Sequence, residues 1–137
     1  MLTFRKHFGG PLAHEAARIF EHIGVSTKVY TTPEVTEAQK VLSTSAYGMS
    51  LLVAGEFEKF CRDHNLDYKA VVLDYGETYN EGYERLGFER FKRPLLFPPQ
   101  GKIGGHCVVQ NAGLVAEPKY PLLTLLANTN GEKVTNA

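Results

Sequence analysis

The sequence predicts a mainly α-helical protein with a short βαβ edge, organised on one long helix. Apolar residues recur at helical spacing from residue 33 to residue 65, a run of roughly eight turns. Two short runs rich in apolar or β-branched residues, 2–8 and 25–31, flank a helical stripe at 11–23. Helical patterns dominate the remainder of the chain. We therefore expect a βαβ remnant over residues 1–31 and a helical domain over residues 32–137.

The βαβ remnant is punctuated by glycine and proline. Gly9-Gly10 ends the first predicted strand, and Pro11 suits the first turn of the helix that follows. Gly24 stands where a helix C-cap is expected. No G-x-G-x-x-G follows a strand anywhere in the chain, so the fingerprint of a dinucleotide-binding turn is missing.

The long helix begins at Thr32-Pro33-Glu34, which supplies an N-cap, a proline at N1 and an acid in the first turn. Between Met49 and Ala54 apolar residues occupy more than one face of this helix. A chain this small cannot cover all of that apolar surface by itself, so a partner surface is needed. The pattern predicts a homodimer built through the 33–65 helix.

Shorter elements follow the long helix. We expect a short helix over 66–74 closed by Gly76, and a further helix over 77–86. An ordered loop over 87–100 follows. The chain then continues with a helix from Val108 and a last helix over 118–126.

Charge and cysteine content exclude several classes of protein. Lys+Arg 15 and Asp+Glu 15 give a formal net charge of +0, with no basic run of the kind that binds nucleic acid or an anionic membrane surface. No apolar run is long enough to span a membrane, and the N-terminus lacks a signal peptide. Two cysteines do not form a disulfide framework. These features predict a cytoplasmic protein that contacts neither nucleic acid nor membrane.

A glycine-rich stretch at 97–111 carries the strongest chemical signal. Two prolines stiffen its approach, and three glycines allow backbone angles and close contacts that other residues block. Cys107 follows directly, where a helix is predicted to begin, and the positive end of a helix dipole favours a thiolate. A reactive cysteine and a buried structural cysteine after a glycine-rich turn both fit this pattern. The glycines are Gly101, Gly104 and Gly105.

Gly104-Gly105-His106-Cys107 resembles the GGHC motif of the UDP-glucose/GDP-mannose dehydrogenase family. Upstream, Glu37-Ala38-Gln39-Lys40 resembles the start of the family's E-x-x-K-x-x-x-N helix, and Glu56 matches a later glutamate. The resemblance covers residues 37–116 for the family's central domain. Residues 2–31 resemble the last βαβ unit of its NAD-binding domain. The implied fold is a central domain similar to the C-terminal domain of 6-phosphogluconate dehydrogenase.

The resemblance also implies roles for individual residues. Cys107 matches the nucleophile of an NAD-dependent oxidation of a nucleotide sugar, and Lys40 matches an oxyanion stabiliser. Gly104 and Gly105 match the substrate-binding turn. Arg85, in Arg85-Leu86-Gly87, resembles an Arg-Ile-Gly whose arginine reaches a neighbouring subunit's sugar nucleotide, and Arg93 is a competing candidate.

The sequence departs from the family's pattern at four positions. Thr44 stands where the family usually has Asn, and Gly55 replaces the Asn before Glu56. Val109 replaces a proline. Asn111 stands where the family usually has Asp, and an amide cannot act as a general base. Thr44 and Asn111 remain candidate catalytic residues because they occupy the matching positions.

The resemblance implies the central, dimerisation and catalytic-cysteine domain of an enzyme that oxidises UDP- or GDP-sugars to uronic acids for polysaccharide biosynthesis. The cofactor half and the nucleotide-binding half are missing, so we expect this chain alone to bind no cofactor, NAD being implied for the full-length enzyme. We also expect it to be inactive alone. The alternative is a non-catalytic dimerisation or assembly module descended from such an enzyme.

Two other constellations are weighed against these hypotheses. Cys61 and His64 have C-x-x-H spacing and could join His106 and Cys107 around zinc, but ordinary buried cysteine is the commoner arrangement, so no metal is expected. Four aromatic residues could stack on bases, yet the basic groove of such a platform is absent, so we expect core and interface aromatics. They are Tyr79, Tyr83, Phe88 and Phe91.

Overall fold

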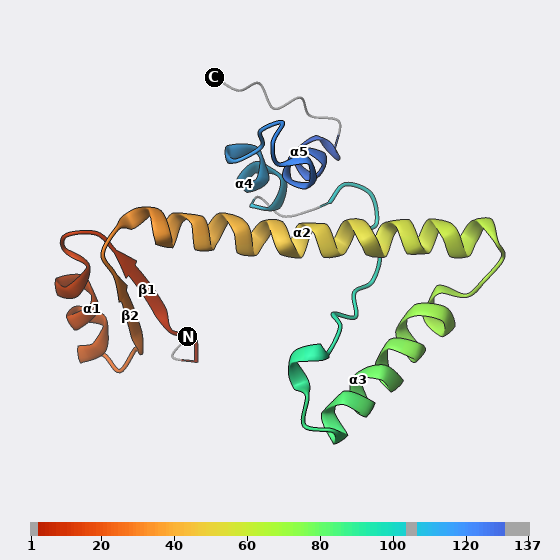
Figure 1. The fold of residues 1–137 in the computed structure, drawn as a ribbon, viewed down its shortest axis with the longest axis horizontal. Helices are drawn as coiled ribbons and strands as arrows, with labels where there is room; N and C mark the ends of the chain where they lie inside the picture. The colour runs from red at the N-terminus through yellow and green to blue at the C-terminus, as the bar shows by residue number, and fades with distance from the viewer. Residues whose placement is uncertain (1–2, 104–106, 131–137) are drawn as a thin grey trace. The chain divides into compact units, whose positions relative to one another are not determined.

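The structure is a computed structural model that describes residues 3–103 and 107–130. It is mainly helical with a short two-stranded parallel sheet, which confirms the predicted fold class at that level (Figure 1). The chain divides into two compact units, Met1–Ser43 and Thr44–Ala137, and the division falls within the long helix.

The first unit is the predicted βαβ arrangement. Strand β1 (Lys6–Gly9) pairs in parallel with β2 (Thr27–Tyr30), and helix α1 (Ala13–His22) connects them. The ring centroids of Phe8 and Phe20 lie 5.1 Å apart, which joins β1 to α1. Gly24 has φ +80° and caps α1 as predicted.

The prediction for Pro11 is wrong. A turn intervenes between β1 and α1, because Gly10 has φ +109° and its carbonyl accepts a hydrogen bond from the Ala13 N–H. Helix α1 therefore begins at Ala13, two residues after Pro11, and Leu12 is its N-cap.

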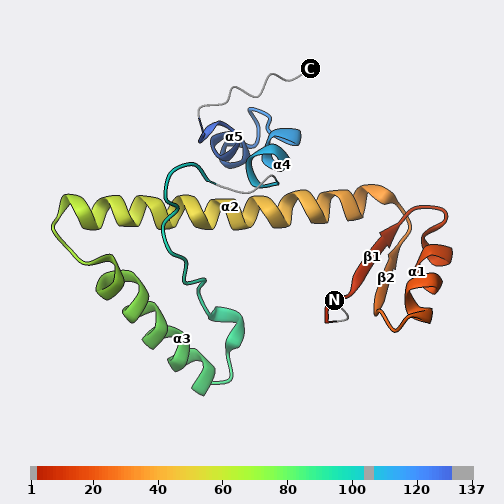
Figure 2. The ribbon, with the colours of Figure 1, turned by 180° about the vertical axis from the view of Figure 1, so that it is seen from behind.

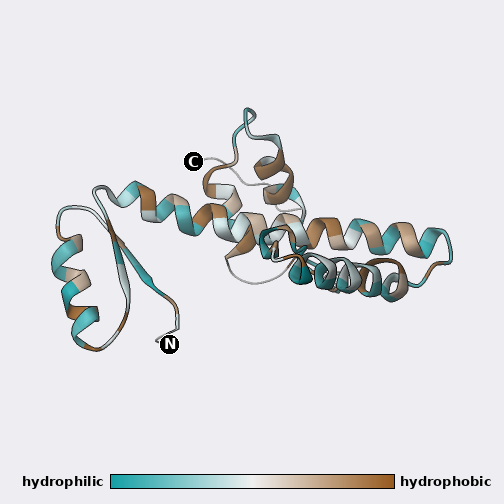
Figure 3. Ribbon diagram, turned by 60° about the horizontal axis from the view of Figure 1, so that its bottom comes forward, coloured by the Kyte–Doolittle hydropathy of each residue, from teal (hydrophilic) through white to brown (hydrophobic). Residues whose placement is uncertain are grey.

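Helix α2 (Pro33–Asp63) has 31 residues, which confirms the long helix. Asn65 ends this run of helix in the left-handed conformation, with φ 54°. Apolar residues recur along α2 (Figure 3). Within the described residues no helix, α2 included, is both long and apolar enough to cross a membrane. In the second unit α2 buries mostly small side chains: Ser45, Gly48, Ala54 and Cys61.

After α2 we expected one short helix that ends at Gly76 and a second helix that begins after it, and this expectation is wrong. A π-helix (Lys69–Asp74) runs directly into α3 (Tyr75–Arg85), and Gly76 is buried inside α3. A Cβ added at Gly76 would overlap the Leu95 side chain. Gly76 therefore serves a close approach of the following segment and does not end a helix.

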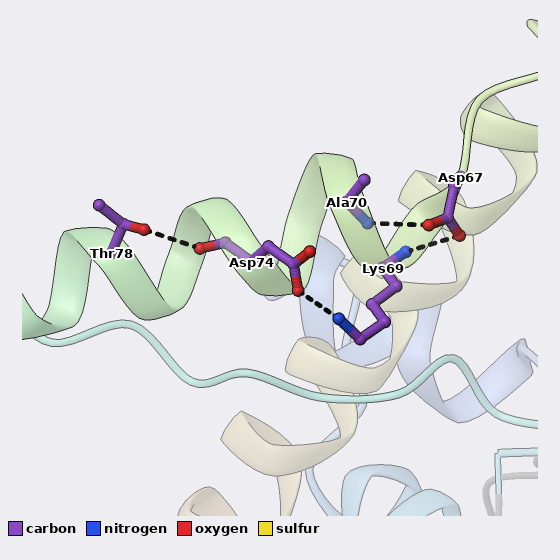
Figure 4. A network of polar contacts seen from close by, with 5 residues as sticks. All are labelled: Asp67, Lys69, Ala70, Asp74 and Thr78. Atoms are coloured by element: carbon purple, nitrogen blue, oxygen red, sulfur yellow. Dashed lines mark hydrogen bonds and ion pairs between the residues drawn. The ribbon is translucent and has the colours of Figure 1, made fainter.

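Polar contacts hold the π-helix (Figure 4). The Asp67 carboxylate accepts hydrogen bonds from the backbone N–H groups of Lys69 and Ala70, each at 3.2 Å. The Lys69 ammonium lies 2.7 Å from Asp74 Oδ1, and the Thr78 hydroxyl donates to the Asp74 carbonyl at 3.0 Å. These bonds satisfy free donors at the start of the π-helix and tie its end to α3.

The segment after α3 is an ordered loop with one 3-10 turn (Glu89–Phe91). The Tyr68 hydroxyl donates to the Leu96 carbonyl at 2.7 Å, which tethers this segment to the start of the π-helix. Burial of the Tyr68 ring raises the pKa of its hydroxyl, so the neutral, donating form is favoured. Figure 2 shows the segment leading from α3 towards α4.

Helices α4 (Val108–Leu114) and α5 (Pro121–Asn128) pack together, and their core contacts the middle of α2. The helix start at Val108 is confirmed. The last helix begins at Pro121 and not at 118, with its proline in the first turn. The Asn130 side chain accepts from the Ile103 N–H and donates to the Ile103 carbonyl, each at 3.0 Å, which closes this subdomain. The buried core comprises Ile103, Val108, Val109, Ala112, Leu126 and Ala127.

Candidate functional site

Cys107 is the N-cap residue of α4, and its side chain is exposed. The hypothesis of a buried structural cysteine is therefore wrong for Cys107. It holds for Cys61, whose side chain on α2 is only 2 % exposed. Gly101 precedes the site with φ +95°, a conformation that favours glycine. The predicted substrate-binding residues Gly104 and Gly105 lie outside the described residues.

Asn111 lies one helical turn beyond Cys107, and its backbone N–H donates to the Cys107 carbonyl at 3.0 Å. The two side chains therefore project from the same side of α4. Asn111 Nδ2 donates to the Thr44 hydroxyl oxygen at 2.9 Å, across a sequence separation of 67. The structure thus brings together Cys107, Asn111 and Thr44, three of the four predicted catalytic residues.

Gly48 makes this contact between α2 and α4 possible. It is buried one turn beyond Thr44, on the same side of α2. A Cβ added at Gly48 would overlap Val108 Cγ1 and lie 2.9 Å from Leu126 Cδ2. Gly48 was not among the predicted site residues, although a glycine inside a long helical pattern is a signal for close packing.

Lys40, the fourth predicted catalytic residue, lies on α2 in the first unit and is exposed. Cys107 belongs to the second unit. The role implied for Lys40 therefore stays a prediction.

The two candidate arginines are associated with α3. Arg85 Nη2 lies 3.6 Å from Glu81 Oε2, and both side chains are mostly exposed, so this ion pair adds little stability. Arg93 is held more firmly. Its guanidinium carbon lies 3.7 Å from the centre of the Tyr79 ring, and the Asn80 amide accepts from its backbone N–H at 2.8 Å and donates to its carbonyl at 2.9 Å. The described contacts of both arginines are therefore made with α3, and none of them is made with α4, which carries Asn111.

The aromatic residues near Arg93 form a surface cluster. Tyr79 and Tyr83 lie 4.7 Å apart, Tyr83 and Phe91 5.4 Å, and Phe88 and Phe91 6.1 Å between ring centroids. A hydrogen bond from Tyr83 lowers the pKa of Tyr79, and Arg93 lowers it further. Phe88 and Phe91 are half-exposed, so these two are not core residues, and their expected role at an interface stays a prediction.

The zinc constellation includes His106, which lies outside the described residues, and the surroundings of Cys61 and His64 do not favour it. Cys61 is buried, and His64 Nδ1 lies 2.9 Å from the Phe60 carbonyl while its ring stacks on Phe60 at 4.2 Å. In the part of the chain that the structure describes, no three His, Cys, Asp or Glu side chains gather in a way that could hold a metal ion.

The Thr44–Asn111 hydrogen bond gives the first testable prediction. We expect Thr44→Val, Asn111→Ala and the double variant to show a coupling of about 0.5–1.5 kcal/mol, since a partly buried pair loses one net hydrogen bond. Urea unfolding followed by circular dichroism gives the change in the free energy of unfolding of each of the three variants relative to the parent chain. Asn111→Asp is the control, because a carboxylate can accept from the Thr44 hydroxyl and keep the contact. Strictly additive effects of the two substitutions would contradict the prediction.

A scan against protein-family models, a search of curated proteins and a search of solved structures each found no match to this chain.

Proposed function

We propose that this chain is the central, catalytic-cysteine domain of a nucleotide-sugar 6-dehydrogenase, similar to those that oxidise UDP- or GDP-sugars to uronic acids, and that it is inactive alone. One observation carries the proposal. Cys107 is exposed at the start of α4, and one turn further on Asn111 meets Thr44 of α2. These are the positions at which the resemblance implies the nucleophile and two polar partners. The central-domain fold of that family is part of this proposal.

The described residues do not fit NAD. The turn after β1 is Gly9-Gly10-Pro11, and Pro11 offers no backbone N–H to a phosphate. A Cβ added at Gly9 would overlap the Thr32 carbonyl oxygen. Thr32, the residue before α2, therefore already occupies the space beside this turn. The pyrophosphate site of a dinucleotide-binding domain needs an open glycine turn at a helix N-terminus. Oxidation therefore belongs to a cofactor domain other than this βαβ unit.

The chemistry assigned to this chain is capture of an aldehyde. The Cys107 sulfur adds to C6 of a nucleotide-sugar 6-aldehyde, a C–S bond forms, and the carbonyl electron pair moves to oxygen, which takes up the thiol proton. The product is a hemithioacetal, and the step needs no oxidant. Oxyanion stabilisation by Lys40, which the resemblance implies, stays a prediction. Asn111, a neutral amide, positions groups by hydrogen bonding and does not transfer a proton.

Protection of Cys107 from alkylation tests the function. We expect UDP-glucose 6-aldehyde to slow iodoacetamide labelling of Cys107, read by peptide mass, because the hemithioacetal has no free thiol. UDP-glucose itself cannot form this adduct and is the matched control. Equal labelling with and without the aldehyde would refute the proposal. NADH absorbance should show no turnover of UDP-glucose or GDP-mannose, and turnover by the chain alone would contradict its proposed inactivity.

A non-catalytic dimerisation module is the second candidate, and the surface of α2 favours it. Val53 and Phe57 are 48 % and 50 % exposed in the middle of this helix. A second copy of the chain would cover such positions, and about 800 Å² per subunit is ordinary for a stable interface. The homodimer through α2 is thus proposed under both candidate functions.

Val53→Asp tests the homodimer. We expect the parent chain to be dimeric by light scattering and Val53→Asp to be monomeric with unchanged helical circular dichroism, because an unpaired charge in an apolar interface is unfavourable by several kcal/mol. Leu52 is a poorer site, since it packs against the core of its own subunit. Lys59→Asp, at an exposed position of α2 that already carries a charge, is the control. A parent chain that is monomeric at micromolar concentration would exclude this assembly.

A further inference from the structure

A pocket lies in the second unit, and the proposed aldehyde chemistry does not use it. Its volume is about 320 Å³, at the lower end of the range for small-molecule sites. Helix α2 supplies one wall, the π-helix and the first turn of α3 supply the second, and the segment after α3 supplies the third. Most of the lining is apolar, and it includes Phe57, Phe60, Val71, Val72, Tyr75 and Leu95.

The π-helix in the pocket wall is the first sign of a ligand. Helices of this kind are rare and frequently occur at functional sites. Here Val71 and Val72 belong to the π-helix, Tyr75 follows it, and all three line the pocket. The Asp67 carboxylate and the Lys69–Asp74 ion pair hold this backbone in place (Figure 4). The wall is therefore a defined structure and not a frayed helix end.

Arg93 is the second sign, because it is the charged residue among those lining the pocket. Its backbone carbonyl accepts from the Asn80 amide, its backbone N–H donates to the same amide, and its guanidinium stacks on Tyr79. Among the described residues no carboxylate forms an ion pair with Arg93. A planar guanidinium without an anionic partner, beside an apolar pocket, is suited to a carboxylate.

A second cavity, of about 240 Å³, lies beside the pocket in the same unit. The two cavities share Phe57, Val72 and Pro94. The second adds further apolar lining from Val53 and Leu96. The two together suit a flexible hydrocarbon chain.

We propose that this pocket binds a medium-chain aliphatic carboxylic acid, with the hydrocarbon chain among the apolar walls and the carboxylate at Arg93. Burial of the chain supplies most of the affinity, and the charge selects an anion over a neutral or cationic amphiphile. Cys61 also lines the pocket. Its thiol is 2 % exposed and reacts only when the structure around it opens, so a ligand that stabilises the closed pocket slows its alkylation.

Calorimetric titration with decanoate below its micelle concentration tests the proposal. We expect one decanoate per chain, and at least about tenfold weaker binding of decyltrimethylammonium, which has the same chain length and the opposite charge. Arg93→Gln should weaken decanoate binding about tenfold, since it removes the charge. Arg90→Gln is the matched control: Arg90 also stacks on a ring, that of Phe91 at 4.9 Å, but it does not line the pocket.

A second readout follows Cys61 in a Cys107→Ser background, where saturating decanoate should slow alkylation of Cys61. Val72→Phe, which adds volume at the wall that the two cavities share, should weaken this protection. Equal affinity for the two amphiphiles, equal effects of Arg93→Gln and Arg90→Gln, or unprotected Cys61 would each overturn the proposal. Decanoate binding that appears only when the parent chain is diluted to a monomer would also overturn it, because a second copy of the chain would then be the occupant.

Discussion

Gly48→Ala is expected to lower the free energy of unfolding of the second unit by about 1–3 kcal/mol, the usual effect of adding volume to a packed core. The new methyl group would overlap Val108 and press on Leu126, both of which are buried. Relief of this overlap requires α4 and α5 to move away from α2. That movement would lengthen the Thr44–Asn111 hydrogen bond. Loss of packing between α2 and α4 should therefore also disrupt the candidate site.

Gly55→Ala is the matched control for Gly48→Ala. Both glycines lie in α2, but a Cβ added at Gly55 would meet only Pro99 atoms, at 3.7 Å and beyond, which is ordinary contact. This substitution should raise stability by up to about 1 kcal/mol, because alanine loses less conformational entropy in a helix than glycine does. Urea unfolding followed by circular dichroism compares the two variants. Equal effects of both substitutions would show that helix propensity dominates and that α2 and α4 do not make this close contact.

Iodoacetamide is expected to label Cys107 at least about a hundredfold faster than Cys61 in the folded chain. Cys107 is exposed, whereas Cys61 is 2 % exposed and reacts only when the structure around it opens, an event with a substantial free-energy cost in a packed region. Peptide mass spectrometry after a short, limited exposure measures both rates in one sample.

Labelling of the chain in urea provides the control for accessibility, since unfolding should bring the two cysteine rates close together. The Cys107→Ser variant should show no fast phase at all. Faster modification of Cys61 than of Cys107 in the folded chain would contradict both the burial of Cys61 and the choice of Cys107 as nucleophile.

The sequence by itself determined the elements whose signals are local. Helix α2 follows from a long apolar period with Thr32-Pro33 at its start, and the βαβ unit follows from two short apolar runs around a helical stripe. The helix start behind Cys107 and the burial of Cys61 were predicted on the same grounds. Each of these depends on spacing along the chain, which a sequence displays directly.

Only the tertiary structure decided which segments approach one another. Gly76 has the appearance of a helix stop in the sequence, yet it lies in close contact with Leu95. Gly48, inside a long helical pattern, signals close packing, but the sequence does not identify Val108 as its partner. The Thr44–Asn111 hydrogen bond and the pocket at Arg93 join residues that are distant in sequence. The physical reason is that such contacts are fixed by the packing of whole helices, whereas helical periodicity depends only on neighbours a few residues away. The π-helix could not be predicted from the sequence either, because the apolar spacing of its few residues does not distinguish it from an α-helix.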